Sequence, residues 1–340
     1  MSKTSEVSHK TKLKMEQNKQ DQGPKNVQSY EAKDIQVLGG LSAVRKRFNV
    51  VELSQKIEKQ GDIQALSKKF KIKPRILALA KDEGRILSQF PNLQKSKAGI
   101  LSGLRTDRDL KLFAQNYDIY IAPARELIKL VRKWNNDLQK NPLHLIDQKE
   151  HDLIIGSLLG DASIRKRERN SCFRISHSIK QEAYINWKYG ILRNFEFSEF
   201  YRRKRTINGI EGEIINFATK THPVFNYYRN LFYKDNIKTI DQNMLQHLNA
   251  RSLAIWICDD GSFSRTQDII ILCTNSFSLE EHKLMRDYFN KKFGLNPTIG
   301  FRDKKYFYLR FRKEDSKKLI EIIKPFIPEC MKYKIGEHQK

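Results

Sequence analysis

The spacing of apolar residues divides the chain into a polar start, a helical middle part and a C-terminal part in which helices and strands alternate. Residues 1–27 are rich in Lys, Gln and Ser and nearly lack large apolar side chains, which predicts disorder. In residues 48–147 apolar residues recur every three or four positions, which predicts a mostly helical region. A break at Phe70-Lys71-Ile72 predicts a tight turn between two short helices, the pattern of a helix-turn-helix.

A similar apolar spacing recurs 47 residues later, where Tyr117 corresponds to Phe70. We expect the first helical unit to end at Gly84 and the second to begin at Asp109. DNA contact is a hypothesis for the first unit because basic residues surround its turn, although a helical hairpin without a role in DNA binding has the same apolar pattern. These basic residues are Lys68, Lys69, Lys71, Lys73 and Arg75.

From residue 148 onward, apolar stretches with helical spacing alternate with stretches in which every second residue is apolar. The order of these stretches in residues 148–245 recurs in residues 246–336, which predicts an α+β fold with two αββα-type halves after the helical region. Strands are expected at residues 172–177, 213–220, 269–274 and 306–312, and helices at residues 181–194, 279–293 and 316–326.

The net charge of the chain indicates which kind of molecule the protein binds. The chain has 64 Lys and Arg against 39 Asp and Glu, a formal net charge of +25, and this excess is spread over the whole length. Such a balance is typical of proteins that bind nucleic acid, and the alternative is an ordinary basic protein such as a ribosome-associated one. No apolar run approaches the roughly 20 residues of a membrane-spanning helix. The four cysteines lie far apart without zinc-ligand spacing, which favours reduced thiols in an intracellular protein.

Two short apolar segments each end in an aspartate and a small residue. The first is Leu153-Ile-Ile-Gly-Ser-Leu-Leu-Gly-Asp161-Ala162 and the second is Leu253-Ala-Ile-Trp-Ile-Cys-Asp-Asp260-Gly261. Gly156 and Gly160 share one helix face, so another backbone can approach there, and packing of the two segments would bring Asp161 and Asp260 together. Adjacent carboxylates repel unless a cation lies between them, and beside nucleic acid we expect Mg²⁺ or Mn²⁺. Each aspartate taken alone could instead be an ordinary helix-end or turn residue.

The paired segments resemble the two motifs of single-chain, intron-encoded LAGLIDADG homing endonucleases. Residues around them also resemble that family, namely Phe217-Ala-Thr-Lys-Thr-His-Pro-Val-Phe225, Leu231-Phe-Tyr233, Thr274-Asn-Ser-Phe-Ser278, Lys292-Phe-Gly-Leu295 and Met331-Lys-Tyr-Lys-Ile335. The resemblance implies two pseudo-symmetric αββαββα halves, residues 148–245 and 246–336, that cut both strands of a specific DNA site with Mg²⁺. Asp161 and Asp260 would be the catalytic metal ligands. By alignment Lys238 and Lys334 would polarise water or stabilise the transition state, the alternative being surface lysines bound to phosphate.

The resemblance further implies that each half places a curved sheet in the major groove. Arg and Lys side chains on such sheets read guanine edges or bind phosphates. The candidate DNA-binding residues are Arg165, Arg167, Arg174, Arg203, Arg205, Arg265, Arg302, Lys304, Arg310 and Arg312.

Residues 28–47 resemble the N-terminus of DNA gyrase B, the ATPase component of bacterial type II topoisomerases, through the run from Tyr30 to Arg47. The ATP-binding residues of gyrase B have no counterpart here, so no ATPase activity is expected. We hypothesise an intron-encoded endonuclease translated in frame from a gyrase B exon, which makes the intronless gyrase B gene its target.

Two other functions stay open. The first is a group I intron RNA maturase, which would bind intron RNA, and the second is a catalytically inactive DNA-binding regulator on the same scaffold. The endonuclease is expected to act as a monomer on double-stranded DNA, without a membrane. We expect it in the cytoplasm of a bacterial or phage-infected cell, or in an organelle.

Overall fold

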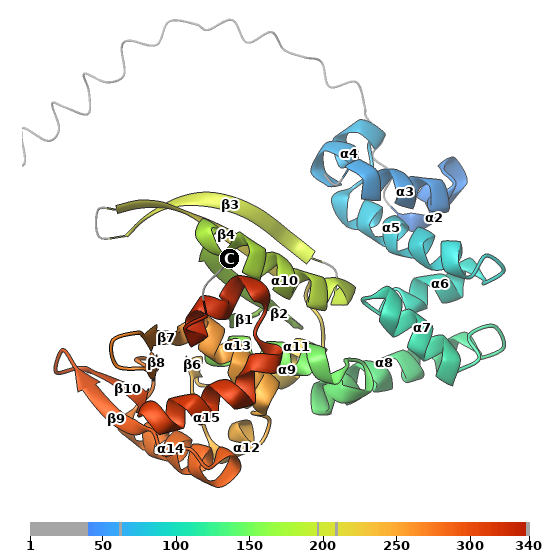
Figure 1. The fold of residues 1–340 in the computed structure, drawn as a ribbon. Coiled ribbons are helices and arrows are strands. Elements are labelled where there is room, and N and C mark those ends of the chain that lie inside the picture. The colour runs from blue at the N-terminus through green and yellow to red at the C-terminus, as the bar shows by residue number, and fades with distance from the viewer. Residues whose placement is uncertain (1–39, 61–62, 196, 208–209, 338–340) are drawn as a thin grey trace, which may run out of the picture.

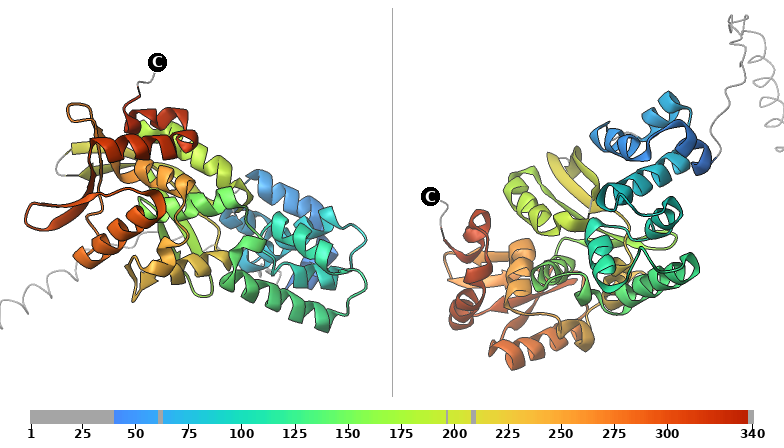
Figure 2. Two further views of the ribbon diagram at one scale, coloured as in Figure 1. Left: turned by 60° about the horizontal axis from the view of Figure 1, so that its bottom comes forward. Right: turned by 90° about the vertical axis from the view of Figure 1, so that its right-hand side faces the viewer.

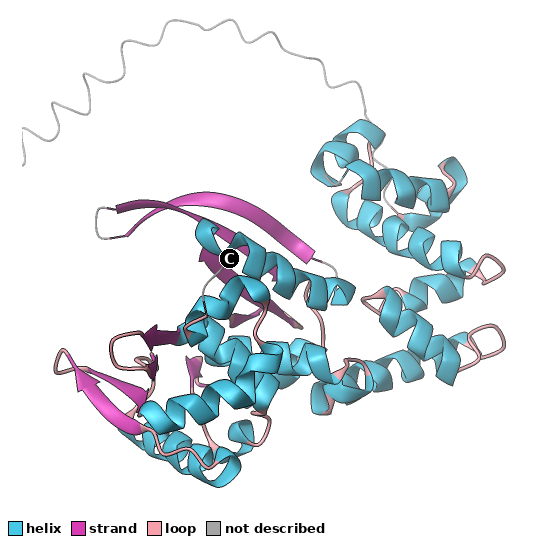
Figure 3. Ribbon diagram, in the orientation of Figure 1, coloured by secondary structure: helices cyan, strands magenta, loops and turns pink. Residues whose placement is uncertain are grey.

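The computed structural model describes residues 40–60, 63–195, 197–207 and 210–337. The segment expected to be disordered, residues 1–27, and residues 28–39 of the gyrase-like segment lie outside this description. Figure 1 shows a helical N-terminal part beside a larger part that contains two four-stranded sheets, and Figure 3 separates the two by element type. None of the described helices has the length and apolar character needed to cross a membrane.

The helices α2 to α5 pack around a small hydrophobic core of their own. The helices α4 and α5 are joined by a turn in which Lys71 has a φ of 55°, and Pro74 begins α5. The turn predicted at Phe70-Lys71-Ile72 is therefore confirmed. Arg45 binds the buried carboxylate of Glu83 and thereby ties α2 to α5. The bounds are α2 Leu41–Arg47, α3 Val50–Gln60, α4 Ile63–Phe70 and α5 Pro74–Gln89, and the core is Val44, Leu53, Ile57, Leu66, Ile72, Leu77 and Ala80.

Both predicted boundaries of these helical units are wrong. Gly84 lies inside α5, and its lack of a side chain serves a close approach, because a Cβ there would lie 2.1 Å from the carbonyl oxygen of Val50 in α3. The second unit begins before Asp109, and within it the hydroxyl of Thr106 caps α7 by accepting the N–H of Asp109. This unit comprises α6 Lys95–Leu101, α7 Asp107–Asn116 and α8 Ala124–Lys140, and η2 Pro142–His144 follows it.

A buried polar network docks the second helical unit onto the first αββαββα half. Asp109 accepts a hydrogen bond from Trp134 Nε1 at 3.1 Å and contacts His222 Nε2 at 2.6 Å. Burial alone would raise the pKa of Asp109, but the charge and hydrogen bond of His222, with Trp134 and Thr106, lower it. Arg108 also binds the buried Glu150 at 2.5 Å. The helical part is therefore anchored by charged groups that sit inside the protein.

Each half contains one helix, two strands, one helix, two strands and a final helix. The strand orders are β1-β2-β4-β3 and β7-β8-β10-β9, with every pairing antiparallel, so the second sheet repeats the first. The predicted α+β fold is confirmed. The first half comprises α9 Gln148–Leu159, β1 Ser163–Lys166, β2 Ser171–Ser178, α10 Glu182–Leu192, β3 Phe197–Ile207, β4 Ile210–Thr219 and α11 Val224–Phe232. The second comprises α13 Ala250–Asp260, β7 Gly261–Ser264, β8 Ile269–Leu272, α14 Leu279–Phe293, β9 Thr298–Arg302, β10 Tyr306–Phe311 and α15 Lys313–Ile323.

Short elements complete the chain. The two-stranded sheet of β5 Tyr233–Lys234 and β6 Ile237–Lys238, with α12 Gln242–Leu245, joins the halves. The 3₁₀ turns are η3 Ile179–Gln181, η4 Arg193–Phe195, η5 Lys324–Phe326 and η6 Glu329–Ile335.

The helices α9 and α13 pack against each other at the centre of the larger part, as Figure 2 shows from two further directions. One face of each sheet is covered by helices, α10 and α11 in the first half and α14 and α15 in the second. In β2 the side chains of Phe173 and Ile175 are buried on the helix side, whereas Arg174 and Ser176 point to the other face. The uncovered face of each sheet is therefore the surface available to a large partner.

Candidate active site

Glycine brings the two motif helices into close contact. A Cβ at Gly156 would lie 2.3 Å from the carbonyl oxygen of Ser252, and a Cβ at Gly160 would lie 2.5 Å from the Cβ of Asp259. No side chain fits at such distances, so the backbones of α9 and α13 meet where the glycines lie. The close approach predicted from Gly156 and Gly160 is confirmed.

Asp161 and Asp260 meet at the end of this helix pair. Asp161 lies between α9 and β1, and Asp260 is the last residue of α13 and directly precedes β7. Burial and the charge of Asp259 raise the pKa of Asp161 to about 6. Burial and the charges of Asp161 and Asp259 raise the pKa of Asp260 to about 7. The site therefore concentrates negative charge, and both carboxylates gain from a nearby cation.

Lys238 and Lys334 hold equivalent positions beside these aspartates. The ammonium of Lys238 donates to the carbonyl oxygens of Gly160 and Ala162, at 3.3 and 2.9 Å, which flank Asp161. The ammonium of Lys334 donates to the carbonyl oxygens on either side of Asp260, those of Asp259 at 3.4 Å and Gly261 at 2.7 Å. Burial lowers the pKa of Lys238, although the charges of the three aspartates oppose that effect. Each lysine thus fixes the backbone around one aspartate and places positive charge next to it.

Asp259 is the point at which the two halves differ, because Gly160 holds the equivalent position in the first motif. The side chain of Asp259 is fully buried and binds the ammonium of Lys188 at 2.7 and 2.9 Å. It also accepts hydrogen bonds from the Tyr184 hydroxyl at 2.8 Å and from the backbone N–H of Asp161 at 3.3 Å. Asp259 therefore connects α13 to α10 and positions the backbone of Asp161.

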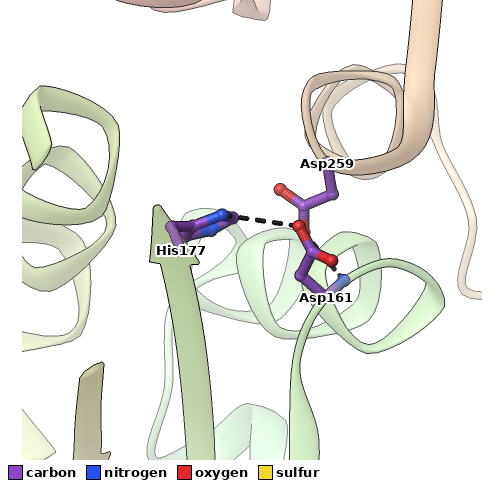
Figure 4. Close-up of side chains that lie close together, drawn as sticks. All are labelled: Asp161, His177 and Asp259. Atoms are coloured by element: carbon purple, nitrogen blue, oxygen red, sulfur yellow. Dashed lines mark hydrogen bonds and ion pairs between the residues drawn. The ribbon is translucent and has the colours of Figure 1, made fainter. Parts of the chain in front are cut away.

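His177 is the remaining group beside Asp161. It comes from the end of β2, and its Nδ1 lies 3.4 Å from a carboxylate oxygen of Asp161, as Figure 4 shows together with Asp259. Burial, with the nearby charge of Lys188, lowers the pKa of His177 to about 4. The imidazole is therefore neutral near pH 7, so its contact with Asp161 is not an ion pair.

The donor set fits a hard divalent cation. Asp161, His177 and Asp259 offer ligand atoms that lie within 4.8 Å of one another. Lys188 and Tyr184 already bind the carboxylate of Asp259, so Asp161 and Asp260 are the carboxylates that remain for a cation. Their pKa values are raised, and a bound cation would lower them. Carboxylate oxygens with room for water and phosphate are the environment that Mg²⁺ prefers.

The uncovered face of the first sheet extends from Asp161. A hollow of about 180 Å³ is lined by Asp161, Arg174, Ser176, Arg203 and Asn216, among others. The strand register agrees, because Arg174 pairs with Ala218 and Ser176 with Asn216, and paired residues share a face. Arg165 lies on β1 and Arg167 directly after it, and both are exposed. Arg205 pairs with Gly212 of β4, and its side chain lies outside the described part.

The basic residues predicted in the second half lie on β9 and β10, directly after β10, and in the turns between β7 and β8 and between β9 and β10. Arg302 ends β9, and Arg310 pairs with Ile271 of β8. Arg265 and Lys304 lie in the turns that connect strand pairs, and Arg312 follows β10. The structure therefore places every predicted basic residue with a described side chain on or next to the two sheets.

The chain is similar to known endonucleases. Residues 151–319 match the model of the LAGLIDADG DNA endonuclease family. A probable intron-encoded DNA endonuclease of Mycosarcoma maydis is 35% identical over 133 residues, which are 37% of this chain and 97% of that protein. The chain belongs to the LAGLIDADG DNA endonuclease family.

Other likenesses extend this result. The cytochrome b mRNA maturase bI2 of Debaryomyces hansenii is 28% identical over 64% of this chain and 85% of that protein. The protein RecA of Mycobacterium gastri is 28% identical over 56% of this chain, which spans only about half (48%) of that relative's length. The homing endonuclease I-WcaI, bound to its DNA recognition sequence, matches with a TM-score of 0.52 and 25% identity, over 60% of this chain and 92% of that one.

Sequence reasoning about this LAGLIDADG protein missed His177, Lys188 and Tyr184. Nothing in their local pattern marks them, because each looks like an ordinary member of a strand or helix. The one indication of these residues in the sequence is Asp259. A second carboxylate next to Asp260 in an apolar helix is expected to be buried and therefore to need a buried partner.

Proposed function

We propose that this protein is a site-specific endonuclease that makes Mg²⁺-dependent double-strand breaks in DNA. The observation that carries the proposal is the pairing of Asp161 and Asp260 between two αββαββα halves, each of which presents a sheet with basic residues. The first strand of each sheet begins next to one of these aspartates, so a duplex lying across both sheets would pass over the pair.

The chemistry is hydrolysis of one phosphodiester bond in each strand. Water adds to phosphorus and the bond to the 3′-oxygen breaks, which leaves a 3′-hydroxyl and a 5′-phosphate. A divalent ion held by Asp161 and Asp260 supplies, when bound, an activated water and charge stabilisation for the leaving oxygen. Lys238 and Lys334 hold the backbone on either side of each aspartate and place positive charge close to the scissile phosphates. The sheet arginines bind the flanking phosphates and base edges.

The proposed target is the intronless gyrase B gene, around the codon that corresponds to Arg47. The support is the likeness of residues 28–47 to the N-terminus of gyrase B. We further propose that the enzyme acts as a monomer, because one chain supplies both aspartates, and that it works in a bacterial or phage-infected cytoplasm or in an organelle.

A plasmid that carries the uninterrupted gyrase B junction of the source organism tests this proposal. We expect the wild-type protein with Mg²⁺ to linearise it near the junction. A plasmid with the intron inserted at the junction is the matched control and should stay intact. The Asp161→Asn/Asp260→Asn variant should bind the junction without cutting it. Absence of any cut by a folded wild-type protein that binds this DNA would refute the proposal.

An RNA maturase is the second candidate. The likeness to the cytochrome b mRNA maturase favours it, since that relative is matched over most of its length. A maturase would bind the intron RNA of its own gene, and its splicing effect would survive the Asp161→Asn/Asp260→Asn substitutions. Splicing of the precursor RNA in the presence of wild-type and variant protein separates the two candidates.

A further inference from the structure

The turn between α4 and α5 carries a dense group of exposed cations. Lys68 and Lys69 lie in the last turn of α4, Lys71 and Lys73 in the connection, and Arg75 at the start of α5. All five side chains are exposed, and none makes an ion pair with a carboxylate in the described parts of the chain. Their charge is therefore available to an anionic partner.

The turn is held rigidly. The Ser67 hydroxyl donates to the carbonyl oxygen of Ile72 at 2.6 Å, and the Ile72 N–H donates back to the Ser67 carbonyl at 3.1 Å. The separate core of α2–α5 and the pair of Arg45 with the buried Glu83 fix the four helices as a unit. In contrast, residues 117–122, the corresponding turn of the second unit, contain no Lys or Arg.

A groove connects the α2–α5 unit to the first sheet. Its volume is about 730 Å³. Residues of α3, α5 and the connection between α6 and α7 line one side, and residues of β2, β4 and the turn after β1 line the other. Lys81, Arg105, Arg167, Arg174 and Lys220 are the basic residues of the lining, against two acidic ones, Glu58 and Asp82. Arg174 also lines the hollow next to Asp161. Arg174 therefore borders both spaces, and basic residues follow one another from the hollow beside Asp161 to the groove that the helical unit lines.

We propose that the α2–α5 unit is a second DNA-binding surface, which holds the duplex that flanks the half-site bound by the first sheet. This inference rests on the proposed function for one point, namely that the duplex lies along the first sheet. The basic turn and the groove do not depend on whether the protein cuts DNA. Because the second half has no such unit among its described residues, the protein would cover more DNA on one side of the cut than on the other. The contacts would be made to phosphates and would add affinity rather than sequence preference.

The test is the salt dependence of binding to a duplex of random sequence, in EDTA, with the full chain. Each lost phosphate contact lowers the slope of log K against log salt by about 0.9. We expect the variant with glutamine at all five turn positions, 68, 69, 71, 73 and 75, to lower the slope by about 2 to 4. A control variant neutralises an equal number of exposed lysines on α14 and α15, on the covered side of the second sheet, and should keep the wild-type slope. Its positions are Lys283, Lys291, Lys292, Lys317 and Lys318.

The outcomes separate the two proposals. A reduced slope for the turn variant, with an unchanged melting temperature, supports the second DNA surface even if the wild-type protein cuts no DNA. Equal slopes for the turn and control variants overturn it, even if the wild-type protein cuts its target. Weakened binding to a single-stranded RNA probe, with the duplex slope unchanged, also overturns it and assigns the surface to RNA.

Discussion

Asp259 makes the two halves chemically unequal at the residue that precedes Asp161 or Asp260. In the first half this position is Gly160, whereas in the second half a buried carboxylate binds Lys188 and Tyr184 of α10. A buried ion pair of this kind contributes little net stability, but removal of one partner leaves an isolated buried charge. The pair therefore serves to hold α10 of one half against the motif helix of the other.

Lys188→Met tests this role. We expect the substitution to lower the free energy of unfolding by about 3–5 kcal/mol, because Asp259 is left buried without its ammonium. The Lys188→Met/Asp259→Asn variant should recover much of that loss. Urea unfolding measures both, and Lys180→Met, at an exposed position of η3, is the matched control. Equal stability of the Lys188 and Lys180 variants would contradict the structural role.

The raised pKa values of Asp161 and Asp260, about 6 and about 7, predict a pH-dependent stability without divalent ions. These carboxyls bind protons more tightly in the folded than in the unfolded chain, so their contribution is complete below about pH 4 and is lost as the pH rises through 6 to 7. Above pH 7 the Asp161→Asn/Asp260→Asn variant should melt about 2–4 °C higher than wild type, a modest gain because the Asp161 side chain is 42% exposed.

Thermal melts across this pH range, with EDTA, measure the effect. Added Mg²⁺ should stabilise the wild-type protein above pH 7 and leave the variant unchanged. If the melting temperatures of the two proteins depend on pH in the same way, the pKa values of Asp161 and Asp260 are not raised in the folded protein.

At the residue scale, the sequence predicts those site residues that occur once in each half. Asp161 and Asp260 could be found because each ends a matching apolar segment, whereas Lys238 and Lys334 followed from the resemblance to the endonuclease family. The structure gives the two lysines equivalent carbonyl contacts. His177 could not be found this way, because it acts through a contact that the pairing of β2 with its neighbours creates.

The elements α9 and α13 act as one unit because glycine allows their backbones to touch. Gly156→Ala places a Cβ about 2.3 Å from the Ser252 carbonyl oxygen, so the helices must separate. We expect a loss of about 1–3 kcal/mol in unfolding free energy. DNA cleavage should also fall, because the aspartates move apart.

Gly190→Ala is the matched control for this prediction. Nothing lies within 4 Å of a Cβ at Gly190, which is inside α10, so alanine there should be neutral or stabilising by about 0.5–1 kcal/mol. Calorimetry of the two variants, together with a cleavage assay, measures the difference. If Gly156→Ala is as stable and active as Gly190→Ala, the close contact is not required.

At the element scale the sequence predicts strongly patterned segments best. The helix expected at residues 279–293 forms as α14 with those bounds, and the strand expected at residues 172–177 forms as β2 with one more residue at each end. The sequence does not predict β3, because the charged run 202–205 interrupts its alternation of apolar positions. It does not predict β9 either, because that strand has only five residues, with Gly300 in the middle. Glycine often follows the last turn of a helix, which predicts an end at Gly84, but here the glycine allows α3 and α5 to pack closely.

At the scale of the whole molecule, the chain combines two LAGLIDADG halves with a helical part that is anchored on the first half. The anchor joins Asp109 to His222, two residues that are 113 positions apart, inside the protein. Local patterns predict that each part exists, but they do not predict this junction, because it depends on which surfaces meet. The junction places the α2–α5 unit, which carries the basic turn, beside the groove of the first sheet.

The central claim is that Asp161 and Asp260 form one site that cuts DNA. The most direct measurement is Mg²⁺-dependent cleavage by the Asp161→Asn and Asp260→Asn single variants, with DNA binding measured in parallel. Because metal-assisted stabilisation is worth several kcal/mol, each variant should bind DNA like wild type and cut both strands at least about 10²-fold more slowly. A single variant that still linearises the target at the wild-type rate would contradict the account.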